Sequence, residues 1–331
     1  MQVVRIFFIV PPEVHLLDIG GPIQVFYEAI KYKAPIELRF LSLDSETEKR
    51  SSAGISLSNL EEYSDQKVRK GDIIFIPGLD AKLVLSDGFH ANISKFYQWL
   101  RLQYEEGAKI CSVCTGAYLS AYSGLLNEKE CTTHWKYLDD FQKRFPKIRL
   151  HRDRLFVKDG LCYSSAGVSS GIDLSLFILE ELFGPIFTTK IAKETVIYLR
   201  RTEDDPQLSV FLQYRNHIEN RIHKVQDHLA QHLNQKQKID SLAELVNMSS
   251  RNLTRLFKKT TGITIGKYHD KLRIEHAIQL LADGQKVESA SHACGLGSNQ
   301  LRELLRKYTD KLPSNFVLIL CTVVLLSIIR A

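Results

Sequence analysis

The sequence predicts two domains, an α/β domain built on a mostly parallel sheet and, after it, an all-α domain. Three observations support this prediction. The chain has 331 residues, about twice the usual length of a domain. Apolar, β-branched runs alternate with helical stretches over the first 165 residues, which is typical of an α/β domain. The last third is helical in its hydrophobic periodicity and basic in its charge.

The composition is that of a globular protein. Hydrophobic residues make up 44% and charged residues 25% of the chain, which excludes a disordered or collagen-like protein. Six cysteines at irregular spacings are too few for a disulfide framework, so we expect a reducing, cytoplasmic location. The N-terminal apolar run lacks the small-residue cleavage pattern of a signal peptide and is better explained as a first strand.

Four strands are expected in the first half, because each candidate is a short apolar run and several of them end at Gly or Pro. They are Val3–Val10, Ile36–Leu43, Asp72–Ile76 and Ala108–Val113. Asp159 and Gly160 stand between two further short runs (155–158 and 161–164) and favour a two-residue hairpin turn. Two apolar helices are expected next, at Gly171–Leu182 and Pro185–Leu199.

The polar, proline-terminated segment Arg200–Pro206 is the expected linker. Beyond it, apolar residues recur every three to four positions and predict an amphipathic helix. These residues are Ile218, Ile222, Val225, Leu229 and Leu233. The same stretch carries His217, His228 and His232 within a narrow arc. No carboxylate or Cys completes a ligand set with them, so we expect solvated border residues and no metal.

A repeat with an offset of 48 residues follows. Ser241, Ser250, Leu253, Leu256 and Lys259 recur as Ser289, Ser298, Leu301, Leu304 and Lys307. Each copy is a short helix, a break (247–249 or 295–297) and a second helix. This is the pattern of a helix-turn-helix unit, whose second helix enters the major groove of DNA.

The second helix of each copy is expected to be amphipathic. The core-facing positions are Leu253, Leu256 and Phe257 in the first copy and Leu301, Leu304, Leu305 and Tyr308 in the second. The expected DNA-contacting positions are Arg251, Asn252, Thr254, Arg255 and Lys258, with Asn299, Arg302 and Arg306 in the second copy. Arg and Asn can pair with base edges, whereas Lys mainly neutralises phosphate.

The distribution of charge supports a nucleic-acid partner. Residues 217–312 hold 16 Lys and Arg against 10 Asp and Glu, whereas the first 216 residues hold 27 against 28. The basic excess therefore coincides with the repeat.

In the first domain, Cys114 is the chemically notable residue. An apolar strand ends at Cys114, Gly116 follows, and a helix begins. A cysteine on so sharp a turn is expected to lie near helix N-terminal amides, which lower the pKa of a thiol. Cys111 lies on the opposite face of the strand, so a redox pair is not expected. The alternative is a structural cysteine at the edge of the sheet.

The stretch 239–316 resembles the AraC/XylS family of transcriptional regulators. The matching segments are SLAELVNMSSRNLTRLFKKTTGITIGKY, KLRIEHAIQLL and ACGLGSNQLRELLRKYTDKLPSNF. The resemblance implies two helix-turn-helix units, joined by a long helix, that read successive segments of the major groove. Ile265, Leu296 and Asp310 stand where the family usually has Pro, an aromatic residue and Gly. The first unit is the closer match.

The first half resembles the ThiJ/PfpI superfamily, a class I glutamine amidotransferase-like domain, and specifically the GlxA-like regulators that join such a domain to an AraC-type end. The matching motifs are LLDIGGPIQVF (16–26), IFIPG (74–78), SVCTGAYLSA (112–121) and CTTHW (131–135). The resemblance implies a flavodoxin-like α/β sandwich with a ligand pocket around Cys114. Asp18 takes the acidic position of that pocket, Gly78 the backbone-amide position, and Thr115 follows the cysteine. His134 either lines the pocket or is a core histidine.

Both resemblances imply a sequence-specific DNA-binding transcriptional regulator without a cofactor. Its partner is operator DNA, and its first domain senses a small molecule or mediates formation of a homodimer. The alternative is a Cys114-dependent isocyanide-hydratase-like or hydrolase-like enzyme, because such hydratases share the Cys-Thr-Gly stretch and the acidic residue. Thr115 stands where protease-like members have a His base, and Leu79 replaces a second Gly near the expected oxyanion site. Both departures favour the regulator.

The expected organisation is a domain at 1–199, a linker at 200–216, a DNA-binding domain at 217–316 and an apolar tail at 317–331. A helix of the apolar residues 316–329 would span about 21 Å at ~1.5 Å per residue, short of a hydrocarbon core about 30 Å thick. We therefore expect a tail that packs on a partner or folds poorly, and no membrane anchor.

Overall fold

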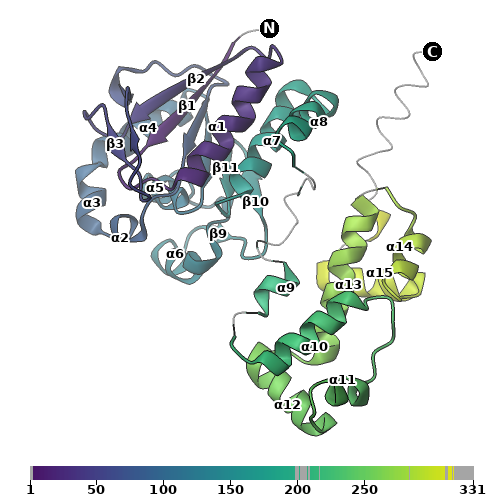
Figure 1. Cartoon of the computed structure of the whole chain (residues 1–331). Coiled ribbons are helices and arrows are strands. Elements are labelled where there is room, and N and C mark those ends of the chain that lie inside the picture. The colour runs from purple at the N-terminus through teal and green to yellow at the C-terminus, as the bar shows by residue number, and fades with distance from the viewer. Residues whose placement is uncertain are drawn as a thin grey trace, which may run out of the picture. The chain divides into compact units, whose positions relative to one another are not determined.

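The computed structural model describes residues 3–197, 201, 207, 209–215, 217–282, 284–309, 312–314 and 316 (Figure 1). The chain divides into two compact units, Met1–Gln207 and Leu208–Ala331. Among the described residues, no helix is both long and apolar enough to cross a membrane. The predicted tail at 317–331 lies outside the described residues.

The first unit is built on a seven-stranded sheet with the order β10-β11-β7-β6-β1-β2-β5. All neighbours pair in parallel except β10, which runs antiparallel to β11. The strands are β1 (Val4–Val10), β2 (Ile36–Ser42), β5 (Glu61–Glu62), β6 (Ile73–Ile76), β7 (Lys109–Val113), β10 (Phe156–Asp159) and β11 (Cys162–Ser165). The four strands predicted from the sequence are confirmed to within one residue at each end. Two short sheets pair β3 (Lys49–Arg50) with β4 (Ser56–Leu57) and β8 (Glu130–Cys131) with β9 (Arg149–Leu150).

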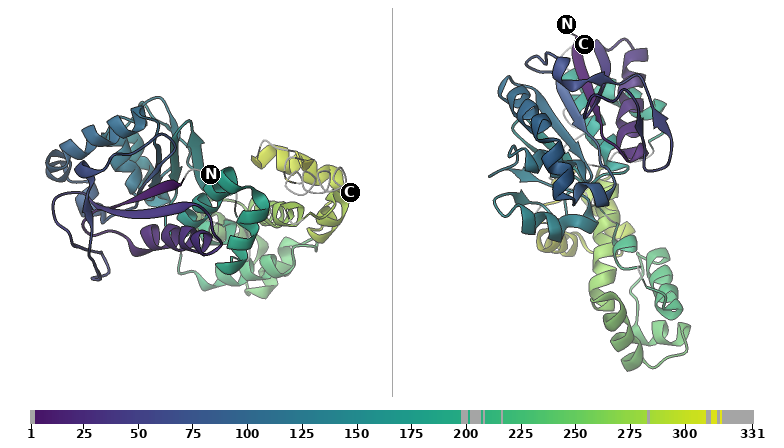
Figure 2. Two further views of the ribbon diagram at one scale, coloured as in Figure 1. Left: turned by 90° about the horizontal axis from the view of Figure 1, so that it is seen from above. Right: turned by 90° about the vertical axis from the view of Figure 1, so that its left-hand side faces the viewer.

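Helices cover both faces of the large sheet (Figure 2). Successive side chains of a strand point to opposite faces, so Phe7 and Ile9 join one apolar core while Ile6 and Phe8 join the other. The first core includes α4 (Ser94–Glu105), α5 (Gly116–Tyr122) and α6 (Leu138–Arg144). The second includes α1 (Leu16–Lys31), α7 (Ser170–Phe183) and α8 (Pro185–Glu194). The short helices α2 (Ala81–Val84) and α3 (Asp87–Asn92) precede α4. Burial on both faces explains why the central strands β1, β6 and β7 are largely apolar.

Two local predictions need correction. The predicted hairpin forms, but Asp159 pairs with Cys162, so the turn residues are Gly160 and Leu161. Gly160, with φ +61°, takes the first turn position, which requires a positive φ in this kind of turn. The helix expected to reach residue 199 ends at Glu194, because Thr195 bonds back to the helix and Val196 takes a left-handed conformation.

The second unit is all-helical. Its helices are α9 (Val210–Gln213), α10 (Asn220–Gln231), α11 (Ile239–Leu245), α12 (Ser250–Thr261), α13 (Ile265–Ala282), α14 (Val287–Ala293) and α15 (Ser298–Thr309). The pairs α11–α12 and α14–α15 are the two predicted helix-turn-helix units, and α13 joins them. Each helix-turn-helix unit has its own apolar core, to which residues of α13 contribute. Tyr268 belongs to the first core, and Leu281 belongs to the second.

The apolar periodicity that precedes the first helix-turn-helix unit predicts the helix α10 only in part. Ile222, Val225 and Leu229 are buried as predicted, but Ile218 precedes α10 and is 97% exposed. The helix begins only after Glu219, whose side chain accepts a hydrogen bond from the second helical N–H and so caps the helix. The short helix α9 falls inside the range expected to be linker and contacts α13.

Candidate functional site

The candidate ligand site lies at the carboxyl edge of the central strands. Because β1, β6 and β7 are adjacent and parallel, the loops that follow them meet at one edge of the sheet. Asp18 lies in the first turn of α1, after β1, while Gly78 follows β6 and Cys114 follows β7. The strand order reverses beside β1, with β2 on one side and β6 on the other. Open α/β sheets bind ligands at such a reversal.

Cys114 forms a strained elbow between β7 and α5. Its φ is +58°, a left-handed conformation that is uncommon for a residue with a side chain. Its N–H donates to the carbonyl oxygen of Ser165 at 3.0 Å, and its carbonyl oxygen accepts a hydrogen bond from the Thr133 hydroxyl at 2.9 Å. These two bonds hold the elbow, and the cysteine is only 2% exposed.

Two glycines allow the elbow to pack against its surroundings. A Cβ at Gly78 would lie 2.3 Å from Asp18 Oδ2 and 2.9 Å from the Cβ of Cys114. A Cβ at Gly116 would lie 2.1 Å from the carbonyl oxygen of Ile76. These distances are too short for non-bonded atoms, so the close approach requires glycine at both positions. The structure thus brings Asp18, Gly78, Cys114 and Thr115 together.

His15 is a member of the site that the sequence analysis missed. Its Nδ1 lies 3.4 Å from Asp18 Oδ2, and this contact with Asp18 raises the pKa of the imidazole above its ordinary value. Asp18 is 1% exposed; its Oδ1 accepts from the Val168 N–H at 2.5 Å, while its Oδ2 has no hydrogen-bond partner. The signal that could have found His15 is its position three residues before Asp18, at the start of α1.

The expectation of a lowered thiol pKa is wrong. Burial raises the pKa of the Cys114 thiol well above its ordinary value, and the negative charge of Asp18 raises it further. The backbone of Thr115 acts in the opposite direction but does not compensate. Burial and the nearby carboxylate therefore both disfavour the thiolate form at the elbow.

The amide of Leu79, next to the expected backbone-amide position at Gly78, is already occupied. Thr115 Oγ1 donates to the carbonyl oxygen of Leu79 at 2.9 Å and accepts from the Leu79 N–H at 3.0 Å. Both groups are buried. The Leu79 amide is thus bonded within the protein and does not offer a free donor for a developing negative charge.

His134 lies at the start of the short 3-10 turn Trp135–Tyr137, and its Nδ1 accepts a hydrogen bond from the Lys136 N–H at 3.3 Å. Burial lowers the pKa of His134, and the carboxylate of Asp18 acts in the opposite direction. The ring is half-buried, and no hydrogen bond between it and Cys114 is found among the described residues. It therefore borders the elbow without completing a cysteine–histidine pair.

His15, Asp18 and Cys114 are the donors that could hold a metal. Their nitrogen, oxygen and sulfur atoms all lie within 4.8 Å of one another. They are the single group of three such donors within the described part of the chain. The three histidines expected to lie in a narrow arc do not form one cluster. The rings of His228 and His232 stack with their centroids 4.2 Å apart, whereas the ring of His217 lies beside that of His223.

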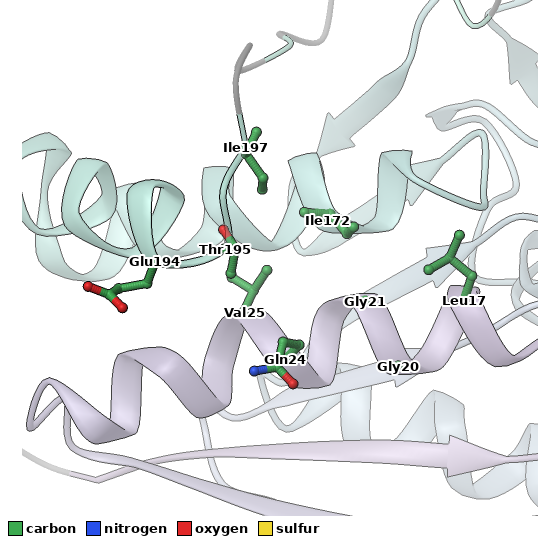
Figure 3. Close-up of a pocket in the computed structure, with 9 residues that line it drawn as sticks. All are labelled: Leu17, Gly20, Gly21, Gln24, Val25, Ile172, Glu194, Thr195 and Ile197. Atoms are coloured by element: carbon green, nitrogen blue, oxygen red, sulfur yellow. The ribbon is translucent and has the colours of Figure 1, made fainter.

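A separate groove of about 440 Å³ runs between α1 and the region of α7 and α8 (Figure 3). It is lined by Leu17, Gly20, Gly21, Gln24, Val25, Ile172, Glu194, Thr195 and Ile197. None of the elbow residues lines it. The groove and the elbow are therefore distinct features of the first unit.

Arg201 and Gln207, which follow α8 in the sequence, form hydrogen bonds with residues next to the elbow. The guanidinium of Arg201 bonds to the buried carboxylate of Asp173 and to the Ser169 hydroxyl, one residue from Val168. The side-chain amide nitrogen of Gln207 lies 2.9 Å from Thr132 Oγ1 and 3.1 Å from the carbonyl oxygen of Thr133. Thr133 is the residue whose hydroxyl holds the elbow carbonyl.

The second helix of the first helix-turn-helix unit, α12, is well defined at both ends. The Ser249 hydroxyl accepts from the Asn252 N–H, and Gly262 ends the helix in a left-handed conformation. Leu253 and Phe257 are buried, and Leu256 is partly buried. The predicted outward residues are all exposed, namely Arg251, Asn252, Thr254, Arg255 and Lys258.

The corresponding helix of the second unit, α15, repeats this arrangement. Leu301 and Leu305 are fully buried, while Asn299, Arg302 and Arg306 are exposed. Arg302 donates to Asn299 Oδ1 at 3.2 Å, so these two side chains are already bonded to each other. Gln300, which the sequence analysis did not select, is also exposed beside them.

These features define a two-domain protein in which an α/β domain with a cysteine elbow precedes a double helix-turn-helix domain. The chain belongs to the DJ-1/PfpI family, whose model matches residues 4–181. A helix-turn-helix domain model matches residues 242–317. The combination implied by the sequence resemblances, including the flavodoxin-like fold of the first domain, is thereby confirmed.

Several known proteins are similar to this chain. The HTH-type transcriptional regulators CdhR and GbdR of Pseudomonas aeruginosa are each 28% identical, over 70% and 67% of this chain and 68% and 61% of their own lengths. Isonitrile hydratase of Pseudomonas putida is 29% identical over 54% of this chain and 72% of its own length. The crystal structure of a putative transcriptional regulator from Vibrio parahaemolyticus shares the fold, with a TM-score of 0.52, 20% identity and coverage of 58% of this chain and 99% of that one.

Proposed function

We propose that this chain is a transcriptional regulator that binds operator DNA through its helix-turn-helix domain and responds to an effector through its DJ-1/PfpI domain. The observation that carries the proposal is the pair of helices α12 and α15, each apolar and buried on one side and basic and exposed on the other. Such a helix, after a tight turn, is suited to enter a major groove. We place this activity in the cytoplasm, with operator DNA as the partner.

In α12 we assign base recognition to Arg251, Asn252 and Arg255, because their side chains can form paired hydrogen bonds with guanine or adenine. Lys258 is assigned to phosphate. The Thr254 hydroxyl bonds to carbonyl oxygens of its own helix at 3.0 Å, so we assign its methyl group to contact with thymine.

In α15 we assign DNA contacts to Asn299, Arg302 and Arg306. The bond between Arg302 and Asn299 orients both side chains along the exposed face of the helix. An arginine that is held in this way loses less conformational entropy when it meets a base or phosphate.

We assign effector binding to the elbow, with Asp18, Gly78, Cys114, Thr115 and His134 as its residues. The raised pKa of the Cys114 thiol and the occupied Leu79 amide suit a binding site better than a catalytic one. We therefore propose a regulator and not an enzyme, and we assign a homodimer interface to the same domain. Purified protein should hydrate isocyanides no faster than a Cys114→Ala control, and turnover that this substitution abolishes would overturn the assignment.

The proposed division of the chain is a sensing domain at 1–199, a linker at 200–216 and a DNA-binding domain at 217–316. Gln207 lies within this linker and is bonded beside the elbow, as described above. Only Leu208 and Ser209 separate it from Val210, whose N–H donates to the carboxylate of Glu275 in α13. A change at the elbow that displaces Thr133 would thus act directly on a short connection to the helix that joins the two helix-turn-helix units.

Selection of genomic DNA fragments bound by the purified full chain tests the proposed function. We expect enrichment of fragments that share one sequence motif, and loss of that enrichment when Arg251 and Arg255 are both replaced by Ala. Arg149→Ala on the exposed surface of the first unit is the matched control and should keep the enrichment. Binding without any shared motif would contradict sequence-specific recognition.

A further inference from the structure

We propose that His15, Asp18 and Cys114 form a binding site for a divalent metal ion of the zinc type, held by one nitrogen, one oxygen and one sulfur atom. A metal ion would then be the effector of the elbow, and this role in regulation rests on the proposed function. Zinc accepts imidazole, carboxylate and thiolate ligands together, and this mixed donor set suits it better than the hard cations Mg²⁺ or Ca²⁺.

The spacing of the donors is close to that of a tetrahedral site. With bonds of about 2.0–2.2 Å to nitrogen and oxygen, two such ligands of tetrahedral zinc lie about 3.4 Å apart. His15 Nδ1 and Asp18 Oδ2 are separated by 3.4 Å. The Cys114 sulfur lies within 4.8 Å of a ligand atom of each of these residues, so a shift of at most about 1 Å would allow a zinc–sulfur bond of about 2.3 Å. Water would take the fourth position.

The carboxylate of Asp18 also suits a cation. Asp18 Oδ2 is buried and makes no hydrogen bond of ordinary geometry, its contact with His15 Nδ1 being 3.4 Å long, whereas the other oxygen of this carboxylate is bonded to the Val168 N–H. A buried carboxylate oxygen that lacks a full hydrogen bond is costly, and such atoms are usually satisfied by a donor or an ion. The thiol would lose its proton to solvent on binding, and the thiolate and carboxylate together would then neutralise the charge of a divalent ion.

The size of the site also favours an ion. Asp18 and Cys114 are 1% and 2% exposed, and Gly78 packs against both. An organic effector would have to open this packing before reaching the sulfur. The side chain of His15, however, is 35% exposed, which gives an ion a route from solvent through its first ligand.

Cobalt titration of the full chain tests the site. After treatment with EDTA, Co²⁺ should bind with a stoichiometry of one per chain and give the sulfur-to-cobalt charge-transfer absorption of a thiolate ligand, and Zn²⁺ should abolish this absorption by displacement. Cys114→Ser should eliminate the charge-transfer absorption. His15→Ala should weaken Co²⁺ binding at least tenfold, because one of three protein ligands is lost. Cys131→Ser, at a buried cysteine elsewhere in the first unit, is the matched control and should bind like the wild type.

Two outcomes would overturn the metal site: absence of the charge-transfer absorption, or its persistence in Cys114→Ser. DNA binding measured in the same samples separates this inference from the proposed function. A protein that shows the absorption but binds no DNA, with or without Zn²⁺, would support the metal site and contradict the proposed function. A protein that binds DNA normally but shows no absorption would support the proposed function and contradict the metal site.

Discussion

Replacement of Gly116 by Ala is the sharpest test of how the elbow is packed. The added methyl group would meet the carbonyl oxygen of Ile76 at 2.1 Å and that of Pro77 at 2.8 Å. Both acceptors are backbone atoms at the end of β6, so neither can move away as a side chain could. Relief requires α5 or the strand to shift by roughly 1 Å, and overpacking of this kind typically costs about 1–3 kcal/mol.

The matched control is Gly20→Ala in α1. A Cβ at Gly20 meets nothing within 4 Å, so this variant gains the helix propensity of Ala, about 0.5–1 kcal/mol, without a clash. The two substitutions make the same chemical change and should move stability in opposite directions. The difference between them should be about 1.5–4 kcal/mol.

Urea unfolding followed by tryptophan fluorescence measures this difference in the first unit alone, because both tryptophans of the chain, Trp99 and Trp135, lie there. The midpoint should fall for Gly116→Ala and rise for Gly20→Ala, with similar slopes. Equal stability of the two variants would refute the argument that α5 approaches β6 too closely for any side chain.

Three further predictions concern the second unit, which lacks tryptophan and is followed by thermal unfolding in circular dichroism. Ser249→Ala removes the cap of α12 and should cost about 1 kcal/mol, and unchanged unfolding would contradict the capping role. Arg273→Ala leaves two loop carbonyl oxygens unpaired and should cost about 2–4 kcal/mol; a smaller loss would mean that these bonds are not retained in solution. Burial lowers the pKa of His269 to about 4, so its unfolded form binds the proton first and stability should fall as pH drops from about 6.5 to 4. His269→Asn should flatten this pH dependence, and a profile equal to that of the wild type would contradict the assignment.

The sequence predicted the architecture well because its signals are local and periodic. The strands β1, β6 and β7 are largely apolar runs buried on both faces, and the repeat in the second unit marks two helix pairs with similar cores. The same reliance on local periodicity wrongly placed Ile218 in the helix. It continues the helical period of α10, but the cap at Glu219 starts the helix after it.

The elbow could be predicted only in part. A strand followed by Cys114 and Gly116 predicts the turn, and the acidic position of Asp18 follows from the family resemblance. The pKa of the thiol depends on burial and on a carboxylate that is distant in sequence, so the local pattern predicted the wrong direction. His15 was missed because its relevance depends on the fold, which places the start of α1 beside the end of β7.

The central claim is that the exposed face of α12 contacts DNA, and the salt dependence of binding tests it most directly. Each phosphate contact contributes about −0.9 to the slope of log affinity against log salt concentration. A variant with Arg251, Arg255 and Lys258 all replaced by Ala should bind the selected operator fragment at least tenfold more weakly and show a slope shallower by about 1 or more. Unchanged affinity and an unchanged slope in this variant would contradict the account.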